Sequence, residues 1–135
     1  MNIRIDEAEH GVPITILHLQ GNLDGSNHQE LISKAHELFV AGMRNLILNM
    51  ADIHFMSGSG IEALHTIALL LRDGRLPDLE NYWGTLENRR DGDTGIQQHF
   101  KLVNVQPRVL KTLEISGMAQ FFEIFDNLSM AIASF

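Results

Sequence analysis

The stretch Leu46–Leu71 constrains the fold more than any other part of the chain. It opens with the apolar run Leu46–Met50, which predicts a central strand covered on both faces of a sheet. Alternating serine and glycine follow at residues 57–60, and an amphipathic helix is predicted from about Ser59 to Arg72. The junction of strand and helix at residues 57–60, called the corner below, presents the free N–H groups and the positive dipole end of a helix. This arrangement suits an anion, either bound or added to a serine as phosphate.

Composition excludes several classes of protein. A chain of 135 residues with 44% hydrophobic and 20% charged residues fits one globular domain that buries its own core. Zero cysteines exclude a disulfide framework and thiolate metal sites, and they fit a reducing compartment. No export signal follows Met1, and no apolar run reaches the roughly 20 residues that span a bilayer. A net charge of −7 argues against DNA or acidic membranes as partners, so we expect a soluble cytoplasmic protein.

The N-terminal segment predicts a β-hairpin. Met1–Glu9 is expected to form a short first strand, which ends at a turn near Gly11-Val12-Pro13. Ile14–Gln20 alternates apolar and polar residues, as a half-buried strand does. A loop is expected at Gly21–Gly25.

Two helices are predicted from capping signals and apolar stripes. The first begins with Ser26 as N-cap, because Gln29 three residues later completes a capping-box pattern, and Gly42 ends it. The second ends before Asp73-Gly74. The inward faces are Leu31, Ile32, Ala35, Leu38 and Phe39 in the first helix, and Ile61, Leu64, Ala68 and Leu71, with Ile67 nearby, in the second.

The C-terminal segment continues the alternation of strand and helix. Phe100–Val105 predicts a buried strand, Pro107 opens a helix that ends at Gly117, and Phe121–Phe125 predicts a last short strand. Asp126 or Asn127 can cap a terminal helix. The inward residues of these two helices are Val109, Leu110 and Leu113, then Leu128, Ala131 and Ile132. We therefore expect an α/β fold with a mainly parallel sheet and right-handed crossovers.

The segment Pro77–Gln98 differs in character from the rest. It is polar, and Asp91-Gly92 and Gly95 are turn signals, so a hairpin around residues 90–93 and a loose surface loop are both open. It also contains Tyr82 and Trp83, which could anchor a partner or fix the segment to the domain.

Five motifs in order resemble the STAS domain, the fold of bacterial anti-sigma factor antagonists. They are Gly21-Asn22-Leu23-Asp24, Leu46–Met50, Phe55-Met56-Ser57-Gly58-Ser59-Gly60-Ile61, Leu102-Val103-Asn104-Val105-Gln106-Pro107-Arg108-Val109, and Ile115-Ser116-Gly117-Met118 through Phe125. The resemblance implies one STAS-like domain of residues 1–135, with a mixed, mainly parallel sheet of about five strands and helices packed against it. Residues 77–98 would be an insertion before the fourth strand.

The resemblance also implies a function. In that family a cytosolic anti-sigma factor kinase phosphorylates a serine or threonine at the N-terminus of the second helix. The unmodified protein binds the kinase and releases its sigma factor, and a phosphatase, which we expect to be of the PP2C type, resets the system. Laid onto this sequence, the acceptor is Ser59, immediately before Gly60, and Asp24 is the acidic residue of the neighbouring loop.

The chain departs from the family pattern at two positions. Ser57 stands where the family usually has an acidic residue, and Gly58 stands where it has a hydroxyl residue. Glu62, three residues after Ser59, could close a capping box with it. We expect the partner-binding surface around the acceptor to comprise Asp24, Ser57, Gly58, Gly60 and Glu62.

Other readings of the corner stay open. Ser59 could be a simple helix N-cap, and the protein could be a scaffold that does not respond to phosphate or a sensor of a small ligand or nucleotide. Gly58–Ala63 fits G-x-G-x-x-A, but Asp78 and Glu80, near the required spacing, lie in the polar segment. A nucleophile elbow needs glycine where Ser57 stands. The seven histidines lack metal-binding spacing, so we expect no metal, no cofactor and no enzymatic activity.

Overall fold

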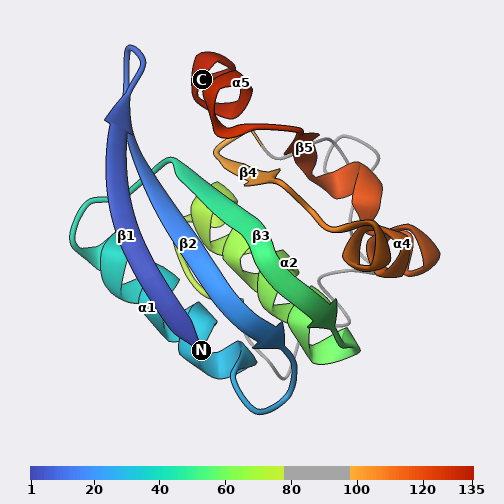
Figure 1. The fold of residues 1–135 in the computed structure, drawn as a ribbon. Helices are drawn as coiled ribbons and strands as arrows, with labels where there is room; N and C mark the ends of the chain where they lie inside the picture. The colour runs from blue at the N-terminus through green and yellow to red at the C-terminus, as the bar shows by residue number, and fades with distance from the viewer. Residues whose placement is uncertain (78–97) are drawn as a thin grey trace.

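The computed structural model describes residues 1–77 and 98–135, which form one five-stranded sheet with helices on both faces (Figure 1). The strand order is β1-β2-β3-β4-β5. The strands are β1 (Asn2–Glu9), β2 (Pro13–Leu23), β3 (Leu46–Met56), β4 (Phe100–Val103) and β5 (Glu123–Phe125). β1 is antiparallel to β2 and all other neighbours are parallel, which confirms the predicted mixed, mainly parallel sheet.

The helices divide between two faces of the sheet. They are α1 (His28–Val40), α2 (Gly58–Asp73), α4 (Pro107–Ile115), the short 3-10 helix η3 (Ala119–Phe121) and α5 (Leu128–Ala133). The larger core joins α1, α2 and α4 to alternate strand residues such as Leu17 and Leu48. The smaller core joins α5 to the intervening residues, including Ile16 and Ile47. The period-2 alternation of β2 therefore serves two cores, one on each face.

The predicted helix faces and two helix ends are confirmed. The stripe residues of α1 and α2 lie in or against the larger core, except Ile32, which is buried outside it. Gly42 adopts a left-handed φ of 117° after α1, and the next amide, of Met43, donates to the Leu38 carbonyl at 2.9 Å. Asn127, the second of the two proposed caps, accepts from the Met130 amide at 2.9 Å.

Several predicted boundaries were wrong. β2 and β3 run on to Leu23 and Met56 instead of ending at Gln20 and Met50, because register shifts let the longer β3 stay paired with β2. β4 ends at Val103, since Asn104 turns the backbone to a φ of 56°. β5 begins at Glu123 and not at Phe121 as predicted, because Phe121 belongs to η3. The expectations for residues 78–97, including Tyr82 and Trp83, lie outside the described residues, so their role as an insertion stays a prediction.

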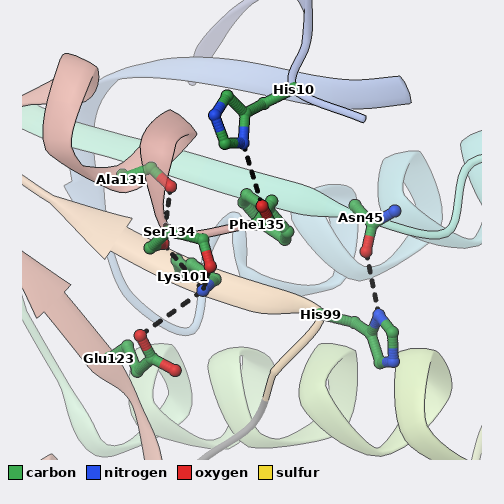
Figure 2. Close-up of polar contacts among 8 residues, drawn as sticks. All are labelled: His10, Asn45, His99, Lys101, Glu123, Ala131, Ser134 and Phe135. Atoms are coloured by element: carbon green, nitrogen blue, oxygen red, sulfur yellow. Dashed lines mark hydrogen bonds and ion pairs between the residues drawn. The ribbon is translucent and has the colours of Figure 1, made fainter. Parts of the chain in front are cut away.

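A buried lysine attaches the C-terminal segment to β4 (Figure 2). Lys101 is only 3% exposed, and its Nζ donates to Ser134 Oγ at 2.8 Å and to Glu123 Oε2 at 3.4 Å. The same ammonium lies 4.4 Å from the centre of the Phe135 ring. A buried ammonium is costly unless it is paired, so these contacts hold the end of α5 over the sheet.

Candidate functional site

The end of β2 is hydrogen-bonded to the residue that precedes α2. Leu23 pairs with Met56 in the sheet, and the Ser57 amide donates to the Leu23 carbonyl at 3.0 Å. Asp24 follows Leu23 in the chain, so the β2–α1 loop lies beside the N-terminus of α2 (Figure 1). The structure thus brings together the two motifs that hold Asp24 and Ser59.

Gly60 makes this close approach possible. A Cβ at this position would lie 2.7 Å from the Leu23 carbonyl oxygen and 2.5 Å from Met56 Cγ, closer than real Cβ contacts allow. Gly58 lies two residues earlier and is exposed, and a Cβ added there would meet nothing within 4 Å. The two glycines therefore differ in kind: Gly60 is required by packing, whereas Gly58 leaves the helix N-terminus open to solvent.

Ser59 lies in the first turn of α2 and is partly exposed. A Cβ built on Gly25 would lie 3.6 Å from Ser59 Oγ, which places this hydroxyl against the β2–α1 loop. Ser59 is not the N-cap, because the helix begins at Gly58 and Ser57 occupies the N-cap position. The predicted capping box between Ser59 and Glu62 is therefore wrong, and Glu62 is exposed on the following turn.

Ser57 is in a different environment from Ser59. Its backbone is extended, with φ −91° and ψ 178°, as an N-cap requires. Its Oγ is buried and has no hydrogen-bond partner among the residues that the structure describes.

Asp24 is a fixed negative charge in the loop. Its Oδ1 accepts from the Ser26 hydroxyl at 2.5 Å and from the Ser26 amide at 2.9 Å. These two hydrogen bonds, with a smaller contribution from His28, hold the pKa of the Asp24 carboxyl below its usual value, so Asp24 is ionised at neutral pH. Ser26 was predicted to be the N-cap of α1, but Asn27 occupies that position, and Ser26 donates two hydrogen bonds to Asp24 instead.

Phe55 is an exposed aromatic residue at the same corner, and sequence reasoning gave it no role. Gly21 pairs with Ile53 and Leu23 with Met56, so β3 holds one more residue than β2 over this stretch. This bulge exposes both intervening residues, His54 and Phe55, and Phe55 is 46% exposed. A large apolar side chain in this position is a candidate partner contact.

Across residues 1–77 and 98–135, no group of three or more His, Asp or Glu side chains could hold a metal ion. In the same part of the chain, no helix is long and apolar enough to cross a membrane. Asp78 and Glu80, the acidic residues weighed for a dinucleotide site, fall outside the described residues.

The chain is similar to solved structures of anti-sigma factor antagonists. One is a candidate antagonist from Thermotoga maritima, 15% identical with a TM-score of 0.69, covering 95% of this chain and 91% of that chain. Another is an antagonist from Mycobacterium paratuberculosis, 14% identical with a TM-score of 0.63, covering 98% and 93%. A third is Bacillus SpoIIAA in its unphosphorylated form, 16% identical with a TM-score of 0.67, covering 97% and 93%. At sequence identities this low, the structural similarity shows a shared fold and nothing further.

The sequence itself identifies the family. No curated protein matches the chain. Residues 6–75, more than half of the chain and including both halves of the corner, match the family model of the STAS domain. The chain therefore belongs to the STAS domain family.

Proposed function

We propose that the chain is an anti-sigma factor antagonist, a non-enzymatic interaction module that binds an anti-sigma factor kinase in the cytoplasm and is regulated by phosphorylation of Ser59. The observation that carries the proposal is the placement of the Ser59 hydroxyl, partly exposed in the first turn of α2 and against the loop of the ionised Asp24. The names of the similar structures support it, since SpoIIAA was solved in both unphosphorylated and phosphorylated forms.

The corner can accept a phosphate without unfolding. The first turn of α2 has free N–H groups and the positive end of the helix dipole, both of which favour an added anion. Ser59 is already partly exposed, so phosphate oxygens attached to it would not have to enter the core. Phosphorylation is therefore expected to change the surface that a partner meets and to leave the fold intact.

The proposed binding surface combines negative charge with one aromatic residue. Asp24, Gly58 and Glu62 face solvent in whole or in part and would contact the partner directly. Ser57 and Gly60 would act through shape, because they hold the start of α2 against the end of β2. We expect the kinase to present a basic surface with an apolar pocket that receives Phe55.

Replacing Phe55 with alanine is expected to weaken kinase binding about 10- to 30-fold, since truncating a central aromatic residue at an interface costs roughly 1.4–2 kcal/mol. The measurement is a calorimetric titration of the variant with an anti-sigma factor kinase from the same organism. The matched control is Val40→Ala, because Val40 is 74% exposed but lies at the far end of α1. Equal affinity of the Phe55→Ala and unmodified chains would overturn this binding surface.

One feature favours a second candidate, an antagonist or scaffold that does not respond to phosphate. The chain has Ser57 where the family usually has an acidic residue, which removes a negative charge beside Ser59 and adds a competing acceptor. This candidate would bind the same kinase through the same surface. Treatment with kinase and ATP would then leave both serines of the corner unmodified.

A further inference from the structure

The free edge of β1 is a second surface of the domain that pairs with nothing in residues 1–77 and 98–135. β1 pairs with β2 on one side and forms the border of the sheet on the other (Figure 1). An edge strand of eight residues offers a row of unpaired N–H and C=O groups to another strand. Ile5, at the middle of this edge, is 42% exposed.

We propose that β1 pairs antiparallel with β1 of a second copy, so that two sheets continue into one across a two-fold axis at Ile5. In antiparallel pairs, directly opposed residues either both point their backbone groups at the partner strand or both point them away. Because these groups alternate along a strand, a strand that pairs with itself must place one residue opposite its own copy. The registers that keep at least five of the eight residues of β1 paired are therefore centred on Arg4, Ile5, Asp6 or Glu7.

Charge selects one of these four registers. A centre at Arg4 opposes two guanidinium groups, and a centre at Asp6 or Glu7 opposes two carboxylates, which is destabilising in each case. A centre at Ile5 sets Ile5 against Ile5 and places Arg4 opposite Asp6 of the second copy on both sides of the axis. Arg4 Nη2 lies 3.9 Å from Asp6 Oδ2 of its own chain, and the two side chains are still 72% and 51% exposed, so both can also face a partner.

Asp6 would present a preset carboxylate to the second copy. Asp6 Oδ2 is hydrogen-bonded to His18 Nε2 on β2 at 2.8 Å, which fixes the carboxylate on the sheet face. The corner of Asp24 and Ser59 lies at the ends of β2 and β3, and Asp24 lines one hollow with Met1 and Asn2 at the start of β1.

Cysteine cross-linking tests this register directly, because the chain has no cysteine of its own. Ile5→Cys would place two thiols on opposed residues, whose Cα atoms in an antiparallel pair are about 4.5–5.5 Å apart, within the range of a disulfide. Glu7→Cys is the matched control: it lies on the same strand face, but its own copy would be about 14 Å away along the strands. We expect mild oxidation to give a covalent dimer with Cys at position 5 and little with Cys at position 7. Equal cross-linking of the two variants, or faster cross-linking of Asp6→Cys, would overturn the register.

Sedimentation velocity over a concentration series tests the association without any cross-link. We expect the unmodified chain to approach twice the monomer mass as its concentration rises. Ile5→Lys should raise the dimer dissociation constant at least tenfold, whereas Val40→Lys, on a more exposed apolar position of α1, should not. Circular dichroism checks that both variants fold. A monomer at every concentration, or equal effects of the two lysines, would contradict the proposal.

Discussion

Phosphorylation of Ser59 is expected to weaken binding to the anti-sigma factor kinase by at least tenfold. A phosphate adds about −1.5 to −2 charges at neutral pH. Ser59 Oγ lies against the loop that holds Asp24, and the hydrogen bonds from Ser26 hold the pKa of the Asp24 carboxyl below its usual value. A partner that docks there would meet two anionic groups in place of one, and like charges at an interface can cost several kcal/mol. Since about 1.4 kcal/mol corresponds to a factor of ten, one phosphate is enough to switch binding off.

The measurement is a calorimetric titration of the kinase with fully phosphorylated and unphosphorylated chain. Ser59→Ala should keep the unphosphorylated affinity and lose the response to ATP. The thermal midpoint of the phosphorylated chain should stay close to that of the unmodified chain, because the helix N-terminus stabilises the added charge. Equal affinities of the two forms would show that the phosphate does not control this interface.

Gly60→Ala is expected to destabilise the fold by about 1–3 kcal/mol or more, the usual cost of forcing extra atoms into a packed site. The added Cβ would lie 2.7 Å from the Leu23 carbonyl oxygen, a backbone atom that is itself hydrogen-bonded to the Ser57 amide. Relief of this clash has to move β2 away from α2, so kinase binding should fall together with stability.

Gly58→Ala is the matched control, because its Cβ meets nothing within 4 Å. Its free energy of unfolding should stay within about 0.5 kcal/mol of the unmodified value, as for most surface substitutions. Urea denaturation of the two variants measures the difference. Equal stabilities of Gly58→Ala and Gly60→Ala would mean that the corner is not packed as described.

Local sequence patterns were enough to predict much of the fold. The apolar stripes of α1 and α2 have a helical period, and a period of this kind depends only on which residues must face a core. Gly42 and Asn127 are end signals whose geometry is decided within a few residues. The alternation of strands and helices then leaves few topologies, and the mainly parallel sheet is one of them.

The details of the corner depend on contacts between distant parts of the chain. Ser59 is a reasonable N-cap by sequence, but Ser57 occupies that position, and its amide is hydrogen-bonded to Leu23, more than 30 residues earlier. The exposure of Phe55 follows from a bulge in β3, which is visible only through its register with β2. Ser26 fits a capping box by spacing, yet the carboxylate of Asp24 binds its hydroxyl instead.

Phosphate mapping by mass spectrometry tests the central claim most directly. The unmodified chain, Ser59→Ala and Ser57→Ala are each incubated with the anti-sigma factor kinase and ATP, and the phosphorylated peptide is sequenced. We predict one phosphate on Ser59, retained in Ser57→Ala and absent from Ser59→Ala. A phosphate on Ser57, or none on either serine while the kinase still binds, would contradict the account.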